Sequence, residues 1–318
     1  MAEGPKIAVI GNGTIAVECC AHLLGLGENV AFIVGDHKDD GRDGWQKSLA
    51  KFARGHDIPF HQPEGINEQK WYDFFAKEAP DFLLSFQYRF IIRRQIIGSA
   101  RKLAANLHFA PLPRYRGMYP IAWALLNGEK EFGVTIHEID PGVDSGDIIA
   151  QKLFSVEESD TARTLYFKAV EKGAELFREA WPSMRGMSFR RTQQDPAKAL
   201  YNPKGSIDFS RNRMDWSLPA EKAFNFARAF IFVPFQLPTM MHEGNELKIV
   251  RVRKADAKGG SRTGAKPGTV LAVSDEGAEV ACGSGSLVVA LTDEVSEQVL
   301  PQCEFMKKYG IRKGASLG

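Results

Sequence analysis

The sequence predicts an α/β protein in which a doubly wound parallel sheet is followed by a small β-rich, barrel-like domain. Two observations lead to this prediction. In the first part of the chain, short apolar runs alternate with segments whose apolar residues recur at helical spacing, as in β-α units of a parallel sheet. In the last part, short β-like runs follow one another closely with turn residues between them, which is typical of a small barrel.

In the first domain, four apolar runs are predicted strands: 7–10, 30–34, 82–85 and 106–109. Helices are predicted where apolar residues recur at helical spacing: 15–24, 45–54, 71–77 and 119–126. A strand pair follows at 133–139 and 148–154. A helix at 161–181, with Leu165, Ala169 and Phe177 on one face, closes the domain.

The composition changes after this helix. Residues 186–204 are polar and basic, include Pro196 and Pro203, and contain few apolar positions, which is linker composition. The predicted organisation is therefore a catalytic domain at 1–185, a linker at 186–204 and a small β-rich domain at 205–318. In the last of these, a helix at 220–231 precedes β-like runs at 247–252, 268–273, 278–281 and 286–291.

Composition excludes several classes of protein. The 318 residues are 44% hydrophobic and 25% charged, as in ordinary globular proteins, and the net charge of +2 gives no general attraction to nucleic acid. The four cysteines make neither a disulfide framework nor a metal-ligand spacing, so no metal is expected. Without a leader-like or membrane-spanning apolar run, we expect a cytoplasmic protein with no membrane partner.

The first strand leads into a glycine-rich turn. The segment IAVIGNGTIA contains Gly11 and Gly13, and Asp36 stands at the end of the next predicted strand, where a ribose-binding acid would lie. Alone, this pattern favours a dinucleotide site and an NAD-dependent oxidoreductase. The alternative is that the two glycines only permit a tight strand-to-helix turn and close helix packing.

Two further segments carry polar side chains at strand ends. In NLHFAPLPRYRG, Asn106 and His108 lie two residues apart in a predicted strand, so their side chains face the same side. They stand near the carboxyl end of this strand, where ligands bind in open α/β folds. In GVTIHEIDPGVDSGDIIAQ, a strand runs into a loop that holds Asp140, Asp144 and Asp147. Alone, that loop is typical of a solvated acidic turn.

Together these segments resemble the folate-dependent formyltransferase family, which includes methionyl-tRNA formyltransferase, glycinamide ribonucleotide transformylase and the formyltransferases of nucleotide-linked amino sugars. The family pattern is N-x-H in a strand, an L-P-x-Y-R-G loop, G-V-T at a strand start and a D-x-G loop. The chain matches it at Asn106, His108, Leu112, Pro113, Tyr115, Arg116, Gly117, Gly133, Val134, Thr135, Asp144 and Gly146. The resemblance covers roughly residues 5–185 and implies a Rossmann-like formyltransferase domain.

The resemblance implies a donor, 10-formyltetrahydrofolate, and a catalytic set of Asn106, His108 and Asp144. It also implies that backbone groups and apolar contacts hold the pterin ring, at Phe90, Ile91, Ile92, Asp140, Pro141, Gly142 and Val143. The glycine turn would then face the acceptor rather than NAD. The chain departs from the family at Phe109, Ala110 and Pro111, where Pro-Ser-Leu is frequent.

A mechanism follows for an amine that attacks a formyl carbon. The Asn106 amide meets the negative charge that develops on oxygen, and His108, whose side chain ordinarily titrates near pH 6.5, moves the proton. If Asp144 lies beside His108, it would favour the imidazolium and order a proton-relaying water.

The acceptor is predicted to be a dTDP- or UDP-linked amino sugar. The resemblance to the sugar enzymes makes Tyr201, Asn202 and Lys204 candidates on the acceptor side, and the alternative is that they form a turn before a strand at 206–209. Initiator Met-tRNA and an amino acid of a specialised pathway are the alternatives within the family, and near-neutral charge weighs against the tRNA. A folate-deformylating hydrolase, an oxidoreductase and a noncatalytic binding module stay open. The sequence also leaves open whether the chain dimerises through its second domain.

Overall fold

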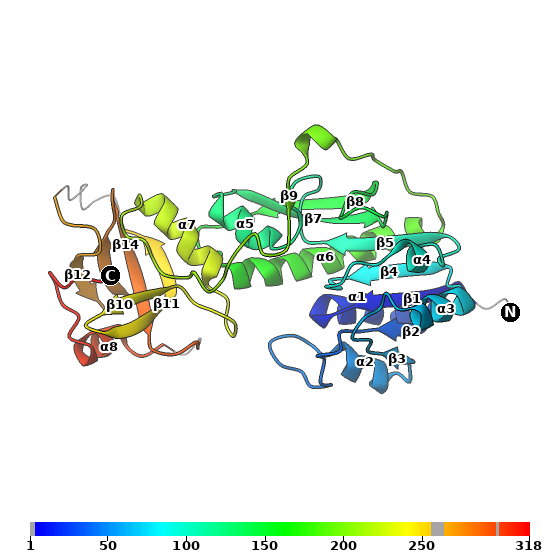
Figure 1. Cartoon of the computed structure of the whole chain (residues 1–318), viewed down its shortest axis with the longest axis horizontal. Helices are drawn as coiled ribbons and strands as arrows, with labels where there is room; N and C mark the ends of the chain where they lie inside the picture. Colours follow the sequence, from blue (N-terminus) through cyan, green and yellow to red (C-terminus); the bar gives the residue numbers. More distant parts are fainter. Residues whose placement is uncertain (1–3, 256–263, 297–298) are drawn as a thin grey trace. The chain divides into compact units, whose positions relative to one another are not determined.

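The computed structural model describes residues 4–255, 264–296 and 299–318, and the chain divides into two compact units (Figure 1). The first unit contains the described residues of Met1–Pro120, Phe132–Phe154 and Phe167–Pro203. The second contains those of Ile121–Glu131, Ser155–Tyr166 and Lys204–Gly318. Two short segments that we assigned to the first domain therefore pack with the C-terminal residues. The predicted domain boundaries at 185 and 205 stay predictions.

The first unit is built on a seven-stranded sheet with the order β3-β2-β1-β4-β5-β7-β8. Its strands are β1 Lys6–Gly11, β2 Asn29–Val34, β3 Phe60–His61, β4 Phe82–Phe86, β5 Leu103–His108, β7 Glu131–Glu138 and β8 Ile148–Ser155. Strands β1 to β5 pair in parallel, whereas β7 runs antiparallel to β5. The predicted parallel sheet is confirmed, with an antiparallel addition at one edge.

The helices of this unit are α1 Gly13–Gly25, α2 Leu49–Gly55, α3 Gln69–Glu78, α4 Arg94–Ile97 and most of α6, Ala162–Arg185. The predicted helix at 45–54 was wrong at its start. Ser48 caps α2 because its hydroxyl accepts a hydrogen bond from the backbone N–H of Lys51 at 2.9 Å. Residues 45–47 precede this cap and stay outside the helix.

Both faces of the sheet are buried, as a doubly wound fold requires. On one face, Ala8 and Leu83 pack in a cluster with Phe75 of α3 and Ile96 of α4. On the other, the rings of Phe82 and Phe86 contact α6, with centroids 5.3 Å from Trp181 and 5.1 Å from Phe177, respectively. Alternate residues of one strand thus serve opposite layers of helices, so the doubly wound prediction is confirmed.

The second unit contains an antiparallel sheet with the order β10-β11-β14-β13-β12. Its elements are α5 Pro120–Leu126, α7 Ala220–Phe230, β10 Thr239–His242, β11 Asn245–Lys254, β12 Val270–Ser274, β13 Gly277–Ala281, β14 Ser286–Thr292 and α8 Gln302–Lys308. Four of these strands were predicted. Strand β10 and helix α8 were not, because each is short and lies beside turn residues.

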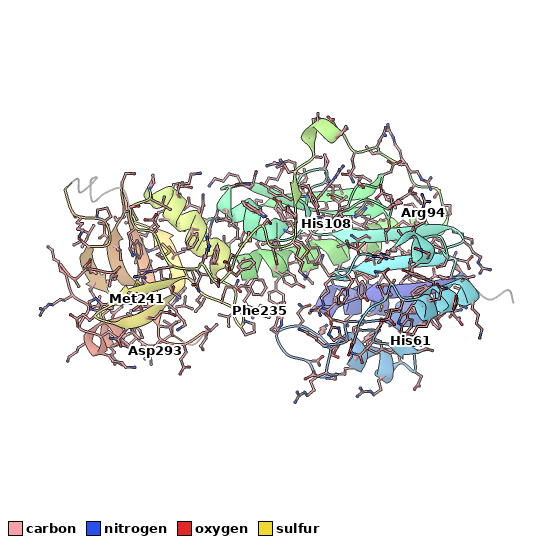
Figure 2. All side chains as sticks on the ribbon, in the orientation of Figure 1. His61, Arg94, His108, Phe235, Met241 and Asp293 are labelled. Atoms are coloured by element: carbon pink, nitrogen blue, oxygen red, sulfur yellow. The ribbon has the colours of Figure 1, made fainter. Side chains whose placement is uncertain are left out.

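The last residues of the chain join the two edge strands of this sheet. The backbone of Gly318 exchanges hydrogen bonds of 2.6 and 2.8 Å with Met241 of β10. Leu317 donates to Gly268, and Val270 of β12 donates to Ala315. The tail therefore pairs with both edges and gives the sheet its barrel-like closure. Met241 is labelled in Figure 2.

A two-stranded parallel ribbon joins distant parts of the first unit. Strand β6, Arg116–Gly117, pairs with β9, Tyr201–Asn202. A short 3-10 turn, η1 at Pro196–Lys198, precedes β9. The segment that its composition marked as a linker therefore includes regular structure beside the loop that follows β5.

Trp181 should be a main determinant of stability. Its side chain is 1% exposed, packs against Phe82 and Phe177, and donates a hydrogen bond from Nε1 to Glu28 Oε1 at 3.1 Å. We expect Trp181→Ala to lower the free energy of unfolding by about 3 to 5 kcal/mol in urea denaturation. Trp181→Phe should cost less, and the exposed Leu26→Ala should change little. Equal effects of Trp181→Ala and Leu26→Ala would contradict this.

Candidate active site

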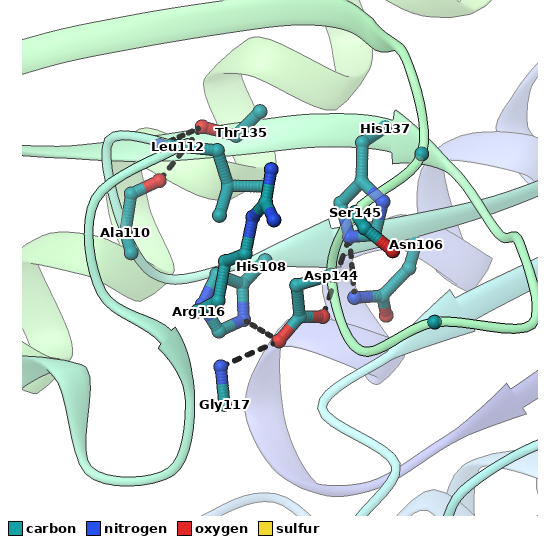
Figure 3. A network of polar contacts seen from close by, with 12 residues as sticks. Asn106, His108, Ala110, Leu112, Arg116, Gly117, Thr135, His137, Asp144 and Ser145 are labelled. Carbon is teal, nitrogen blue, oxygen red and sulfur yellow. Dashed lines mark hydrogen bonds and ion pairs between the residues drawn. The ribbon is translucent and has the colours of Figure 1, made fainter. Parts of the chain in front are cut away.

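Strand β5 carries two of the predicted catalytic side chains. Asn106 and His108 lie two residues apart on this strand, and His108 is buried and is its last residue (Figure 3). The antiparallel pairing with β7 sets Asn106 opposite His137 and His108 opposite Thr135. The amide of Asn106 contacts His137 Nε2 at 3.1 Å. Residues from two neighbouring strands thus converge on one place.

Asp144 completes this cluster from a loop that follows β7. Its Oδ2 lies 3.7 Å from His108 Nδ1 and its Oδ1 lies 3.5 Å from His137 Nε2. The backbone N–H of Gly117 donates to Oδ2 at 2.8 Å. Figure 3 shows the carboxylate between these groups. The structure therefore brings together Asn106, His108 and Asp144, as the family pattern implied.

The electrostatic environment keeps Asp144 ionised. Burial alone would raise the pKa of this carboxyl. The positive charge that His108 carries when it is protonated, the hydrogen bond and charge of His137 in its protonated form, and the Gly117 N–H outweigh that effect, so the pKa of Asp144 lies well below the usual range for aspartate. A negative charge with little exposure to solvent thus lies beside two imidazole rings.

The tautomer of His108 follows from its partners. Its Nε2 lies 2.9 Å from the carbonyl oxygen of Tyr115, which can only accept, so Nε2 carries a hydrogen in this contact. The other nitrogen, Nδ1, faces Asp144. Proton exchange on the Asp144 side of the ring therefore involves Nδ1.

His137 is a site residue that the sequence reasoning missed. Its ring is 3% exposed, and its Nδ1 lies 2.7 Å from the carbonyl oxygen of Glu138, which makes Nδ1 the donor. Nε2 then faces both Asn106 and Asp144. The sequence shows this histidine in the segment GVTIH. It can be assigned to the site only when one knows that its strand, β7, pairs antiparallel with β5, the strand of Asn106.

The loop after His108 is held by Thr135 and Gln151. The Thr135 hydroxyl donates to the Ala110 carbonyl at 2.7 Å and accepts from the Leu112 N–H at 3.2 Å. Gln151 donates to the same hydroxyl and to the Leu112 carbonyl, both at 2.9 Å. Ala110 itself is fully buried. The chain's departure from the family pattern at this position therefore lies inside the protein core.

The Asp144 loop has a conformation that few residues tolerate. Asp144 has a positive φ of 51°, in the left-handed region. A Cβ on Gly146 would collide with the Glu138 carbonyl, which explains the glycine of the D-x-G pattern. Asp140 folds the loop onto itself, because its carboxylate accepts from the Ser145 hydroxyl and the Gly142 N–H. The loop thus aims Asp144 back toward β5.

The expected pterin-binding residues lie in two loops. Ile91 is 66% exposed, whereas Ile92 is 8% exposed and belongs to the apolar cluster on one face of the sheet. Ile139, which precedes Asp140, packs against the same cluster. The Ile91 carbonyl accepts a hydrogen bond from the Asn67 side chain at 2.7 Å. Within the first loop, Ile91 therefore presents the more accessible apolar side chain.

The glycine turn after β1 has a structural explanation. Gly13 has a φ of 65°, and a Cβ on Gly11 would lie 3.0 Å from the Phe86 carbonyl oxygen. The Thr14 N–H at the start of α1 donates to Gln46 Oε1 at 3.1 Å. Asp36 is 5% exposed and pairs with Arg89 at 3.0 Å. These contacts favour the tight-turn interpretation over a dinucleotide site.

Comparison with known proteins identifies the family. The formyl transferase family model matches residues 5–181, and the model of the formyl transferase C-terminal domain matches residues 206–310. The chain belongs to the formyl transferase family. It is therefore a folate-dependent formyltransferase, with 10-formyltetrahydrofolate as its formyl donor. The family that the sequence motifs predicted is confirmed. The NAD-dependent oxidoreductase that the glycine turn alone favoured would belong to a different reaction class.

Individual relatives differ in their acceptors. A methionyl-tRNA formyltransferase of Myxococcus xanthus strain DK1622 is 30% identical over 313 residues, which are 98% of this chain and 97% of the relative. The solved structure of WlaRD, a sugar 3N-formyl transferase with dTDP and 5-N-formyl-THF, is 25% identical with a TM-score of 0.73, over 91% of this chain and 98% of that one.

An N-formyltransferase from Helicobacter canadensis, solved with folinic acid and dTDP-3-aminofucose, shares the fold. It is 23% identical, with a TM-score of 0.72, over 91% of this chain and 100% of that one. In the described ranges of this chain, no helix is long and apolar enough to cross a membrane. Those ranges likewise contain no group of three or more His, Cys, Asp or Glu residues placed to hold a metal ion.

The carboxyl group of Asp144 should make the free energy of unfolding depend on pH in the acidic range. Because its folded-state pKa lies below the unfolded value of about 3.9, ionised Asp144 stabilises the fold above that value, and the stabilisation is lost as the pH falls through the folded pKa. We expect the difference in unfolding free energy between wild type and Asp144→Asn to shrink as the pH falls below about 4. Urea denaturation across that range measures it, and a difference independent of pH would contradict it.

Proposed function

We propose that this formyltransferase moves the formyl group of 10-formyltetrahydrofolate onto the amine of a nucleotide-linked amino sugar, with Asn106, His108 and Asp144 as the catalytic residues. The observation that carries the catalytic assignment is their convergence at the end of β5, where His108 lies 3.7 Å from an ionised Asp144 whose side chain is 15% exposed. Groups with complementary charge and strong hydrogen bonds in one cluster are typical of acyl-transfer sites.

Each residue has a distinct task in this scheme. Bound 10-formyltetrahydrofolate supplies an activated formyl group. One N–H of the Asn106 amide contacts His137, which leaves the second N–H to stabilise negative charge on the formyl oxygen. His108 Nδ1 takes up the proton that the attacking amine loses as the amine nitrogen bonds to the formyl carbon, and Asp144 stabilises the imidazolium that results. The proton then passes to the folate nitrogen as its bond to the formyl carbon breaks, so that tetrahydrofolate leaves and His108 is neutral again. His137 holds the Asn106 amide in its orientation.

The pterin ring is assigned to the two loops at Phe90 to Ile92 and Asp140 to Val143. Ile91 offers an exposed apolar side chain, and Ile139 and Ile92 anchor the two loops to one apolar cluster. The chain's own apolar surface thus fits an aromatic ring there. The amino-sugar acceptor rests on the resemblance to WlaRD over nearly the whole chain and on the net charge of +2.

Met-tRNA is the second candidate acceptor, because the Myxococcus xanthus relative is named a methionyl-tRNA formyltransferase. We favour the sugar, since binding tRNA requires a basic surface that neutralises several phosphates. The chain carries 41 Lys and Arg residues against 39 Asp and Glu. A cytoplasmic location stays our prediction from the cysteine pattern.

Substitutions in the cluster test the catalytic assignment. Asn106→Ala, His108→Ala and Asp144→Ala should each lower kcat by about 100-fold or more, since removal of one oxyanion donor alone costs about 3 to 4 kcal/mol of barrier. The measurement is tetrahydrofolate release, with urea denaturation to verify folding. His56→Ala, at an exposed histidine after α2, is the matched control. A folded His108→Ala enzyme with wild-type kcat would refute the scheme.

An acceptor panel tests the substrate class. We expect release of tetrahydrofolate from 10-formyltetrahydrofolate to require one dTDP- or UDP-linked amino sugar and to vanish in His108→Ala. Release only with Met-tRNA, or only with an amino acid, would overturn the sugar proposal and keep the chemistry. Rapid release without any amine would indicate a hydrolase. Binding of folate without turnover would indicate a binding module and overturn both proposals.

A further inference from the structure

We propose that Gln194, in the segment of the first unit between α6 and β9, is a positioning residue that sets the orientation of the Asp144 carboxylate. This inference rests on the proposed catalytic role of Asp144. Gln194 is 6% exposed, although its neighbours Gln193 and Asp195 are exposed. A single buried amide in a polar segment indicates a specific set of partners.

The Gln194 side chain connects the loop of Asp144, which follows β7, to the segment of Arg116, which follows β5. Its Nε2 donates to the carbonyl oxygen of Asp144 at 2.9 Å and to that of Gly146 at 2.7 Å. Its Oε1 accepts from Arg116 Nε at 3.0 Å and from Arg116 Nη2 at 2.8 Å. All of the hydrogen-bonding capacity of the amide is used inside the protein.

The partners determine which way the amide faces. Carbonyl oxygens only accept hydrogen bonds and a guanidinium only donates them, so the amide nitrogen must face Asp144 and Gly146 and the amide oxygen must face Arg116. A glutamate at position 194 would keep the pairing with Arg116. It would also set a carboxylate oxygen against two carbonyl oxygens, which is repulsive.

The contact matters because Asp144 has an unfavourable backbone conformation. A φ of 51° lies in the left-handed region, which is unfavourable for a residue with a side chain unless its surroundings hold it. Gln194 holds the carbonyl of Asp144, and the Gly117 N–H holds its carboxylate. Without the amide, the loop would be free to turn the carboxylate away from His108.

Arg116 connects Gln194 to the segment that follows β5, which contacts both His108 and Asp144. It lies between Tyr115, whose carbonyl accepts from His108, and Gly117, whose N–H donates to Asp144. By bonding Arg116 and the Asp144 loop together, Gln194 sets the distance between the groups that contact the two catalytic side chains. A buried network that is fully satisfied in this way is rigid.

Backbone pairing on both sides brings Gln194 into place. Thr192 forms an antiparallel bridge with Ile148, with hydrogen bonds of 2.8 and 2.9 Å. After η1, strand β9 pairs with Arg116 and Gly117 of β6. The segment is therefore tied to the sheet before Gln194 and to the catalytic loop after it.

The test replaces Gln194 by residues of the same length. Gln194→Glu loses both loop donors and keeps the pairing with Arg116, whereas Gln194→Met loses all four hydrogen bonds. We expect each to lower kcat by about 10- to 100-fold while KM for folate and acceptor stays within about threefold of wild type, because only alignment is disturbed. Gln193→Glu and Gln193→Met, at the exposed neighbour, should keep wild-type kcat.

A double-mutant cycle separates positioning from a general structural effect. Single-turnover formyl transfer is compared for Gln194→Glu in the wild-type and in the Asp144→Ala backgrounds. If Gln194 acts through Asp144, its substitution slows the wild-type enzyme but leaves Asp144→Ala unchanged. Equal slowing in both backgrounds would show an independent structural effect and overturn the proposal.

The remaining outcomes distinguish this inference from the proposed function. An Asp144→Ala enzyme with wild-type activity would refute the catalytic assignment itself. An inactive Asp144→Ala enzyme beside fully active Gln194→Glu and Gln194→Met enzymes would leave the catalytic assignment intact and overturn the role of Gln194. If urea denaturation shows both Gln194 variants unfolded under assay conditions, Gln194 is a folding determinant and the positioning role is overturned.

Discussion

The largely desolvated negative charge of Asp144, whose side chain is 15% exposed, is the constraint on which the site depends. A carboxylate away from water is tolerated only when charges and hydrogen bonds compensate it. Here the compensation comes from His108 of β5, His137 of β7 and the N–H of Gly117. Segments far apart in the sequence must therefore meet at one point. The antiparallel addition of β7 to a parallel sheet is the topological feature that permits this meeting.

In the segment Tyr115–Gly117 that follows β5, each residue makes a different contact with the site. Tyr115 supplies a carbonyl that fixes the tautomer of His108, Arg116 supplies two donors to Gln194, and Gly117 supplies the N–H for Asp144. Gly117 has a φ of 86°, and a side chain there would collide with the Asn202 carbonyl. The motif is thus a set of backbone and side-chain contacts that surround the catalytic groups, and each position has its own physical reason.

Catalytic chemistry and acceptor choice depend on different parts of the family's structure. In our proposal, the cluster of Asn106, His108 and Asp144 transfers the formyl group to an amine, whatever molecule carries that amine. This chain is similar both to a solved sugar 3N-formyl transferase and to a relative named methionyl-tRNA formyltransferase. The acceptor is selected by surfaces that differ among proteins of one fold, so the fold does not identify it, and the amino sugar stays our proposal.

The sequence by itself determined the local structure and the family. Apolar periodicity located most strands and helices because burial of alternate or helically spaced side chains leaves a direct pattern, and the N-x-H, P-x-Y-R-G and D-x-G segments determined the reaction class. Tertiary structure alone decided the positions of His137 and Gln194. Their roles arise from the pairing of β7 with β5 and of β9 with β6, and contacts between distant segments leave no periodic signal in a single sequence.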